Sequence, residues 1–492
     1  MRDPVPPPGA DVSATRPGPI AREAGAAAGP TAADASAGPT APGGAARFTE
    51  PDAAAHSIAP ELRAGAAPGP NAPGAAARFT EPDAAALDEL RQMARDGYAR
   101  GDLSEAIDLQ CKLLAAGPPV SGDALFLALM LFTARELPAG IALLRDSLTH
   151  FPDDPALHEN LAVFLLASNE PAASAAACRQ ALALGSASPN VHDCLCDALN
   201  QLGEVDDAVR AGRAALEAKD RMFGARQPVI RVPAGPPPAF DPDRPGENVI
   251  AYCLWGNEPR YLVPLLESVR ILPHLFPAWS IRVYYDTTVD HNYMMALAKR
   301  GVQLRQMILP PGQPAHRRLL WRFEAIRDPS VKRFLIRDAD ALLNVKERVA
   351  VDAWLLSDRY FHAMRDWYTH TDLILAGMWG GVGNVLPSPT ELFRASTGWR
   401  IENDHIDQDI LSDTVWPAIR HSVLIHDSIF TGTLGSVPFP PFGRLPAGSH
   451  IGQNAFAHFN PANVTQAQGT QASGTQVSAT QARGTQAHGT RT

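Results

Sequence analysis

The chain has 492 residues, of which 45% are hydrophobic, so it is long enough to fill the cores of two or three domains. Its formal net charge is −9, and no lysines and arginines cluster in a stripe, which argues against nucleic acid as a partner. The five cysteines lack the paired spacing of a zinc site, which indicates small core residues in a reducing compartment.

No apolar run approaches the roughly 20 residues that span a bilayer. The N-terminus, in turn, lacks the apolar core of a signal peptide. We therefore expect no transmembrane segment and a location in the cytoplasm, either free or peripheral at the inner face of the membrane.

Both ends of the chain have compositions that cannot form a core. Residues 1–86 consist mainly of Ala, Pro and Gly, and a Thr-Gln-Ala-x-Gly pattern repeats over residues 461–492. Neither segment has enough apolar surface to offset the entropy of ordering, so we expect both to be disordered. A short segment around Phe48 recurs around Phe79, which suits either a docking peptide or slippage in a low-complexity gene.

From residue 87 to about 220 the hydrophobic pattern is helical and repeats every 34 residues, as Leu127, Leu161 and Leu195 illustrate. Four units of this length begin near residues 87, 121, 155 and 189. The pattern predicts that each unit is a pair of helices.

The turn inside each unit is less regular than the period. In the first and last units, Gly101 and Gly203 are placed to end one helix in a left-handed cap before the next helix begins. We place Glu136 and Asn169 at the equivalent positions of the second and third units. These departures weaken the individual units but leave the period intact.

This pattern resembles the tetratricopeptide repeat family, whose units stack into an all-α solenoid with a concave face. The resemblance implies a module that binds a protein partner or self-associates. The alternative is a plain scaffold that extends the next domain. A Pro-rich stretch over 221–247 then predicts a stiff linker.

A second domain is expected over 248–460, where strands alternate with helical stretches. Four strands are predicted first, at 249–255, 280–286, 302–309 and 334–336. The alternation predicts a mainly parallel, Rossmann-like α/β sheet that binds its ligand at the carboxyl ends of the strands. Gly256, Asp286 and the pair Asp338 and Asp340 all fall at such ends.

Asp338 and Asp340 follow a short apolar strand and are separated by one residue. Residues two apart in an extended chain point the same way, so the two carboxylates would lie together. Like charges this close favour a cation between them, and Mg²⁺ or Mn²⁺ would accept these oxygens while leaving positions open for phosphate. The alternative is an acidic turn that closes the strand.

Three further motifs follow this pair. Glycines beside Trp379 permit close approach of the backbone to a ligand or, alternatively, a tight turn packed on the indole. Acidic residues at 404–409 open a helix that we expect to end before Pro417, where they serve as caps or as acid–base groups. A strand at 421–425 then presents His426.

Taken together, these stretches resemble a bacterial glycosyltransferase family with the GT-A type of nucleotide-sugar fold, which is often attached to tetratricopeptide repeats. The matching stretches are Trp255–Asn257, Trp321–Phe323, Arg337–Asp340, Arg365–Asp366, Gly377–Gly380, Asp407–Asp409 and His426–Asp427. One departure is Trp367-Tyr368, which stands where a His-Pro pair is expected and affects the acceptor side.

The resemblance implies a role for each candidate residue. Asp338, Asp340 and, as a third ligand, His426 would hold Mn²⁺ or Mg²⁺; the alternative for His426 is a buried, hydrogen-bonded histidine. Asp407 or Asp409 would act as general base or contact the acceptor. The residues that would contact the donor are Trp255, Gly256, Asp286, Arg322, Arg337, Trp379 and Gly380. The alternative for Arg322 and Arg337 is pairing with local acids, and for Asp286 it is a turn at the strand end.

These roles describe a metal-dependent glycosyltransferase that moves a sugar from a nucleotide diphosphate to a glycan, a lipid-linked acceptor or a protein. Two alternatives stay open: a repeat-based adaptor whose second domain is inactive, and a metal-dependent nucleotidyltransferase. No Gly-rich phosphate loop is present, which argues against hydrolysis of a nucleoside triphosphate.

Overall fold

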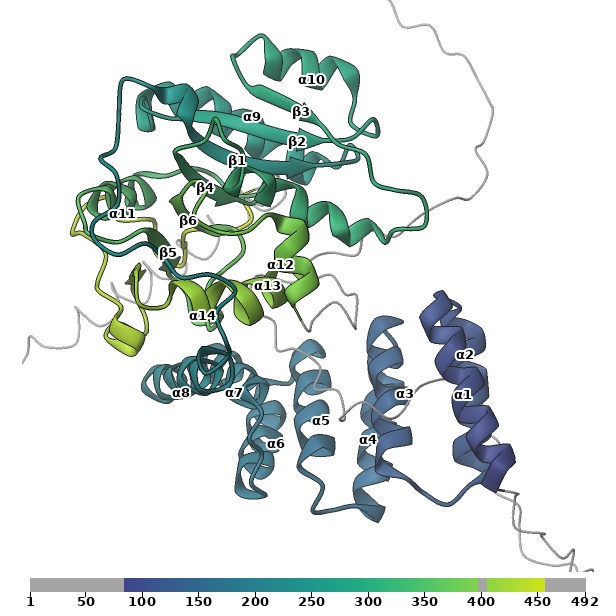
Figure 1. The fold of residues 1–492 in the computed structure, drawn as a ribbon. Coiled ribbons are helices and arrows are strands. Elements are labelled where there is room, and N and C mark those ends of the chain that lie inside the picture. Colours follow the sequence, from purple (N-terminus) through teal and green to yellow (C-terminus); the bar gives the residue numbers. More distant parts are fainter. Residues whose placement is uncertain (1–83, 397–404, 456–492) are drawn as a thin grey trace, which may run out of the picture. The chain divides into compact units, whose positions relative to one another are not determined.

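The computed structural model describes residues 84–396 and 405–455 (Figure 1). The segments that we expect to be disordered lie outside these residues, apart from Ala84–Ala86, which begin the first helix. The described residues form a series of helical pairs followed by a sheet with helices on both faces.

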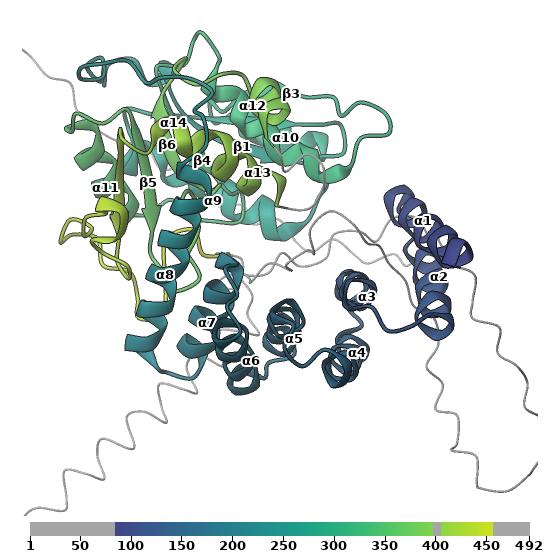
Figure 2. The ribbon, with the colours of Figure 1, turned by 60° about the horizontal axis from the view of Figure 1, so that its bottom comes forward.

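Eight helices form four pairs between residues 84 and 224, and Figure 2 shows several of them nearly end-on. They are α1 (Ala84–Arg100), α2 (Leu103–Ala116), α3 (Ser121–Thr133), α4 (Leu137–His150), α5 (Pro155–Ala167), α6 (Pro171–Ala183), α7 (Pro189–Gln201) and α8 (Val205–Gly224). The helices α3, α5 and α7 begin 34 residues apart, which confirms the predicted period.

One position of the turn within each pair is left-handed in all four pairs. Gly101, Arg135, Asn169 and Gly203 lie 34 residues apart and have φ values of 84°, 62°, 61° and 77°. The prediction for the two glycines is therefore confirmed. In the second pair the equivalent residue is Arg135 and not Glu136, which instead precedes α4 as its N-cap residue.

The remaining chain forms a seven-stranded sheet with the order β3-β2-β1-β4-β6-β5-β7. Its strands are β1 (Asn248–Leu254), β2 (Ser280–Tyr285), β3 (Gln303–Gln306), β4 (Arg333–Arg337), β5 (Phe361–Arg365), β6 (Met378–Val382) and β7 (Val423–Asp427). The first four strands are parallel, as predicted.

The strand β6 is antiparallel to both β4 and β5, and β5 is parallel to β7. All strands except β6 therefore run the same way. Their carboxyl ends lie along one margin of the sheet, which we call the carboxyl edge, and β6 begins there.

Helices cover both faces of the sheet because successive strand residues point to opposite sides. Ile250 and Tyr252 pack under α9 (Pro259–Leu275), α10 (His291–Ala298) and α11 (Val345–Leu355). Val249 and Ala251 pack on the other side. The elements there are η2 (Ala315–Ile326), α12 (Pro389–Ala395), α13 (Ile406–Ile410), the π-helical η4 (Leu411–Val415) and α14 (Trp416–Ile419). Two short 3-10 turns, η1 (Pro245–Glu247) and η5 (Thr433–Gly435), complete the described elements.

The helix that we expected to end before Pro417 continues to Ile419. The π-helical η4 precedes it, and Pro417 then lies in the first turn of α14. Since α14 directly follows η4, Pro417 removes one hydrogen bond from a helix that continues past it.

The last helical pair packs against the sheet domain, at a contact that we call the seam. The ammonium of Lys219 on α8 lies 2.7 Å from Asp193 on α7 and 2.8 Å from Asp372 of the sheet domain. Nearby, the fully buried ring of Phe430 packs on Gly212, where a Cβ would overlap it. Further contacts of the seam join Arg226 to Asp413, Asp220 to Arg420 and Trp416, and Cys196 to the carbonyl of Tyr368.

The Pro-rich stretch after α8 also contacts the sheet domain. The ring of Phe240 stacks on Trp279 with centroids 5.8 Å apart, and the carbonyl of Asp241 accepts a hydrogen bond from Asn248. Within the part of the chain that the structure describes, no helix has the length and apolar character needed to cross a membrane.

Candidate functional site

The strand order of the sheet reverses between β1 and β4. The chain steps outward from β1 to β2 and β3, then returns to the other side of β1 to form β4. In open α/β sheets, ligands bind outside the carboxyl ends of the strands at such a reversal. The residues that follow the two strands are Trp255 and Gly256 after β1, and Asp338 after β4. Gly256 has a φ of 66°, which its lack of a side chain permits at no steric cost.

Arg322 of η2 holds Asp338 from the interior. It donates to Asp338, to Asp407 of α13 at 2.7 Å and to the carbonyl of Arg337 at 3.2 Å. Burial opposes the charge of this guanidinium, but the adjacent carboxylates of Asp338 and Asp407 outweigh it, and the pKa of Arg322 is raised. The side chain of Asp338 is 41% exposed, so a fixed cation supports a carboxylate that solvent can reach.

Asp340 points to a different arginine. The strand ends at Arg337 and the chain turns at Ala339 and Asp340, with the N–H of Ala341 bonded to the carbonyl of Asp338. The alternation of an extended chain therefore does not reach Asp340, and its carboxylate accepts from Arg260 of α9 at 2.8 Å. The expectation that the two carboxylates present their oxygens on one face of a strand is corrected accordingly.

The surroundings of Asp340 disfavour its charge. Burial and, after it, the negative charge of Asp338 raise the pKa of Asp340, while the guanidinium of Arg260 opposes this rise. A cation bound between the two aspartates would relieve the same repulsion.

Asp286 lies at the end of β2 and is held by a third arginine. One of its oxygens accepts from Arg318 of η2 at 2.9 Å, and the other accepts from the backbone N–H of Thr288 at 3.0 Å. The hydroxyl of Thr288 also accepts from the N–H of Gly256 at 2.8 Å. The loops after β1 and β2 are thus joined beside the reversal.

The loop before β6 closes the site on its other side. A Cβ on Gly377 would overlap the carboxylate of Asp338, so glycine allows the loop to approach this carboxylate without displacing it. The side chain of Gln408 on α13 holds the loop by bonding the N–H of Ala376 and the carbonyl of Ile374. The neighbouring Asp407 is buried and committed to Arg322, whereas Asp409 is half-buried.

The three predicted metal ligands are not brought together. Among residues 84–396 and 405–455, no group of three or more His, Cys, Asp and Glu side chains is arranged to hold a metal. The carboxylates of Asp338 and Asp340 are hard oxygen ligands, and Mg²⁺ often takes only one or two protein carboxylates together with substrate phosphate. The ligand type of Asp338 and Asp340 therefore suits such an ion, and His426 lies apart from them.

His426 instead belongs to a buried aromatic cluster. Its strand β7 is separated from β4 by β6 and β5. Its Nδ1 lies 2.9 Å from Nε2 of His362, which stacks on Trp354, and the ring of Phe439 lies against its other side. Burial lowers the pKa of His426 to about 4. The alternative of a buried, hydrogen-bonded histidine describes this residue.

Three of the predicted donor contacts face the interior. Trp379 is fully buried between Phe323 and Phe334, which leaves it no surface for a ligand. Gly380 permits β6 to lie close to β4, since a Cβ there would overlap the backbone of Phe334. Arg337 is buried and paired with Glu347 of α11. These residues support the sheet and do not touch the donor, and for Arg337 the alternative of pairing with a local acid describes the structure. Of the others, Trp255 is half-buried beside the same edge.

Sequence reasoning missed Arg260 and Arg318. Arg318 is separated from its partner by 32 residues and Arg260 by 80, so no local pattern joins them. One signal was available: Arg260 opens the helix directly after the loop that follows β1, a place that faces the carboxyl edge.

The same edge continues to the end of β5. Asp366 accepts from Lys346, from Ser428 and from the N–H of Ile451 at 2.9 Å, so it anchors three segments. Trp367, which departs from the family pattern, is half-buried and stacks on His450 with centroids 5.1 Å apart.

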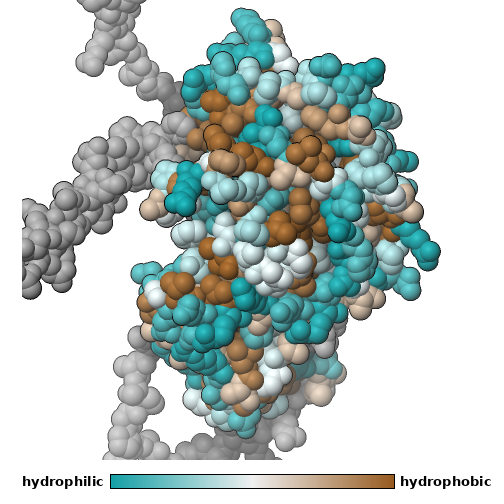
Figure 3. All heavy atoms as spheres, turned by 90° about the vertical axis from the view of Figure 1, so that its left-hand side faces the viewer, coloured by the Kyte–Doolittle hydropathy of each residue, from teal (hydrophilic) through white to brown (hydrophobic). Residues whose placement is uncertain are grey.

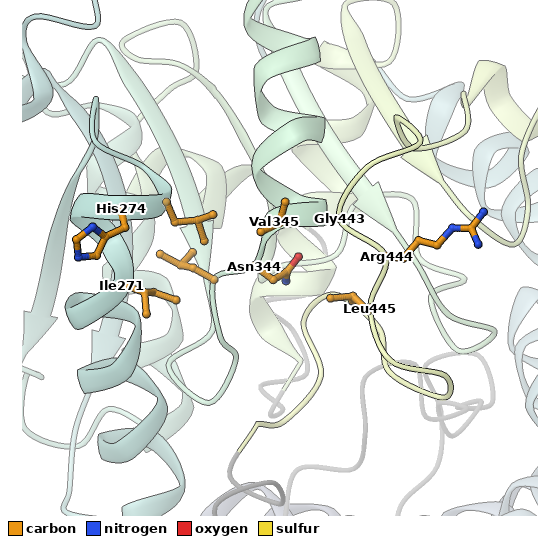
Figure 4. Close-up of a pocket in the computed structure, with 9 residues that line it drawn as sticks. Ile271, His274, Asn344, Val345, Gly443, Arg444 and Leu445 are labelled. Atoms are coloured by element: carbon orange, nitrogen blue, oxygen red, sulfur yellow. The ribbon is translucent and has the colours of Figure 1, made fainter.

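A surface pocket of about 520 Å³ lies away from these residues. Its lining comes from the C-terminal part of α9, the start of α11 and the segment 443–445, and Arg444 extends away from the other lining residues (Figure 4). None of its lining residues is an aspartate or arginine of the carboxyl edge. One face of the molecule, shown in Figure 3, carries small hydrophobic patches separated by hydrophilic atoms.

No protein-family model matches the chain, and no curated protein does. Among solved structures, a mutant of the Thermobaculum terrenum O-GlcNAc transferase is 21% identical with a TM-score of 0.34, and the match covers 53% of this chain and 47% of that one. MamA from Desulfovibrio magneticus is 16% identical (TM-score 0.26; 27% of this chain, 76% of that one). A TPR protein of Thermus thermophilus is 22% identical (TM-score 0.24; 27% and 73%). With TM-scores this low, the similarities carry no conclusion about activity.

Proposed function

We propose that the chain is a glycosyltransferase that binds a nucleotide diphosphate sugar at the carboxyl edge between β1 and β4. The observation that carries the proposal is the gathering of aspartates and arginines at this reversal from α9, η2, α13 and the ends of β2 and β4. Such a donor has hydroxyl groups that can donate hydrogen bonds to the carboxylates. It also has a diphosphate that the guanidinium groups can bind. The mainly parallel sheet, with an acidic pair directly after β4, supports a domain of the GT-A type.

Asp338 and Asp340 are the residues that would hold Mn²⁺ or Mg²⁺. Such an ion, when bound, neutralises the negative charge of the departing diphosphate. The buried Arg322 would keep Asp338 in place, and Asp286, which accepts from Arg318 and Thr288, would accept from the nucleoside.

Asp409 is the candidate for the group that takes the proton of the acceptor hydroxyl. A general base must be able to receive a proton within hydrogen-bond reach of the acceptor. Asp407 is already engaged by Arg322 and accepts the N–H of Gln408, so its role is to position Arg322 and the loop before β6. Asp409 lies two residues further along α13; it has interaction partners of its own, but it is half-buried whereas Asp407 is buried.

The acceptor would be a glycan, a lipid-linked sugar or a protein. The half-buried Trp367 offers an aromatic surface on the same edge, beside β5. The helical pairs would then bind a protein partner or a second copy of the chain, as stacked helical repeats commonly do.

The first experiment measures binding of UDP and GDP by calorimetry in the presence of Mn²⁺. We expect binding by the unaltered chain and a loss of about tenfold or more in Asp338→Asn, because a charged contact is removed. Asp352→Asn is the matched control, since Asp352 pairs with Arg348 on the surface of α11. Binding that is unchanged in Asp338→Asn would contradict the site.

The second experiment identifies the reaction class with a panel of nucleotide sugars. Release of a nucleoside diphosphate supports a glycosyltransferase. Release of pyrophosphate would indicate a nucleotidyltransferase. Failure to bind any nucleotide would leave the repeat-based adaptor as the better description.

A further inference from the structure

Arg260 is placed where it can serve the diphosphate of the proposed donor. It is the second residue of α9, directly after the loop that follows β1, so it lies on the β1 side of the reversal. Its Nε and Nη2 both donate to Oδ2 of Asp340, at 3.1 and 2.8 Å. The side chain keeps 22% of its surface exposed, so a ligand can reach it from solvent.

The charges around the reversal are already paired with one another. Three guanidinium groups face four carboxylates, those of Arg260, Arg318, Arg322 and of Asp286, Asp338, Asp340, Asp407. A diphosphate that entered this set would meet only guanidinium groups that already hold a carboxylate. Its binding therefore requires either an added cation or an arginine that changes partner.

The three arginines differ in how easily they could change partner. Arg322 is buried and joins two carboxylates and a carbonyl, so its release would leave several buried groups without a partner. Arg318 holds Asp286 together with Thr288, away from the aspartate pair. Arg260 and Arg318 are similarly exposed, at 22% and 19%, and Arg260 is the one of these two that holds a member of the aspartate pair.

Releasing Arg260 alone would be unfavourable. Asp340 would then be a largely buried carboxylate beside Asp338, without a positive charge to compensate it. A divalent ion on these two carboxylates replaces that charge, so binding of the ion and release of the arginine favour each other. The released guanidinium, on its flexible side chain, can then bind a phosphate with two parallel hydrogen bonds.

Building on the proposed function, we propose that Arg260 holds Asp340 in the ligand-free protein, is displaced from it by the divalent cation, and then binds the diphosphate of the donor. Arg260 and the cation thus compete for Asp340, while Arg260 and the cation together hold the diphosphate. Removal of this side chain must then change the two affinities in opposite directions.

The test compares Arg260→Gln with the unaltered chain in two calorimetric titrations. With Mn²⁺ alone, we expect tighter binding by about two- to tenfold in the variant, because a competitor for Asp340 is lost. With UDP or GDP at saturating Mn²⁺, we expect binding weakened by about 10- to 100-fold, because a charged hydrogen-bonding group is lost. Arg260→Lys keeps the positive charge but lacks the planar guanidinium. Its two affinities should therefore lie between those of the unaltered chain and those of Arg260→Gln.

Arg270→Gln is the matched control. It lies on the same helix, and its guanidinium holds Glu267 on the exposed surface. Neither titration should change in it. Circular dichroism and thermal unfolding show whether the variants fold. If Arg260→Gln does not fold, the two titrations of Arg260→Lys decide the outcome.

Two results overturn the inference and differ in what they leave standing. If the unaltered chain binds UDP or GDP but the Arg260 variants change neither affinity, or weaken both, Arg260 is not the exchanging residue and the proposed function stands. If the unaltered chain binds neither nucleotide with Mn²⁺, the proposed function is wrong, and this inference with it.

Discussion

Two regions of the molecule use the same contact, a cationic side chain held between aspartates, in different surroundings. At the seam, Lys219 and its partners Asp193 and Asp372 are all nearly inaccessible to solvent. At the carboxyl edge, the buried Arg322 joins the buried Asp407 to Asp338, whose side chain is 41% exposed. The difference lies in burial rather than in the chemistry of the groups.

Burial decides what such a contact can do. Removing one partner of a buried ion pair leaves an uncompensated charge, so the pair can exist in only one arrangement. A partly exposed pair loses a partner at less cost, and an ion or ligand that supplies the missing charge can take that partner's place. The seam is therefore suited to hold the last helical pair in place, and the carboxyl edge is suited to exchange partners.

The largest effect is expected from Lys219→Met. Methionine keeps most of the volume of the side chain but leaves the carboxylates of Asp193 and Asp372 facing each other without a cation. We expect the free energy of unfolding to fall by about 3–5 kcal/mol, measured by urea denaturation. Lys112→Met, which removes an exposed pair with Asp108, should change it by less than about 0.5 kcal/mol. Equal effects of the two variants would contradict the contrast between the regions.

Gly212→Ala tests the apolar part of the seam. The added methyl group would overlap the ring of Phe430, so we expect a loss of about 1–3 kcal/mol in urea denaturation from overpacking. Glu217→Ala, at an exposed position of the same helix, controls for helix propensity. A stability unchanged in Gly212→Ala would mean that Phe430 packs elsewhere in solution.

At the carboxyl edge, Arg318→Gln should separate stability from binding. Asp286 keeps its bonds to Thr288, and Arg318 is partly exposed, so we expect the stability to change by less than about 1 kcal/mol. Affinity for UDP or GDP should nevertheless fall by about tenfold, since Asp286 loses its orientation. If Arg318→Gln lowered the stability but left the affinity unchanged, Arg318 would support the fold and not the binding of the nucleotide.

The smallest effect concerns Asp340 and depends on pH. Because burial and the charge of Asp338 raise its pKa, the folded protein binds this proton more tightly than the unfolded chain does. The stability that this group contributes is thus present below its ordinary pKa of 3.8 and is lost as pH rises through the raised value. Asp340→Asn should flatten this dependence and raise stability near neutral pH by up to about 1 kcal/mol. Urea denaturation over a pH series measures it, and a less stable variant at neutral pH would contradict the sign.

The sequence was informative where the pattern is local. The 34-residue period predicted all four helical pairs, because each pair repeats the same short-range contacts. Three of the first four strands could be located because each is a short run rich in apolar residues, whereas β3 spans only Gln303–Gln306 within the predicted 302–309. The error at Glu136 arose because a left-handed position filled by Arg135 leaves no glycine as a marker.

The sequence was less informative where distant segments meet. The reversed direction of β6 places Trp379 in the core, and the order of the strands removes His426 from the aspartate pair. The partners of Asp338 and Asp340 likewise come from η2 and α9, on opposite faces of the sheet. Such pairings depend on topology, which no short motif encodes.

Phe430 belongs by sequence to the sheet domain, yet its ring lies in the hydrophobic cluster of the helical pairs. If the chain were cut within the Pro-rich stretch, the sheet fragment would expose the ring of Phe430. The helical fragment would expose the apolar surface around Gly212 on which this ring packs. The last helical pair and the sheet domain therefore share one apolar core, and separating them would expose part of it on both sides.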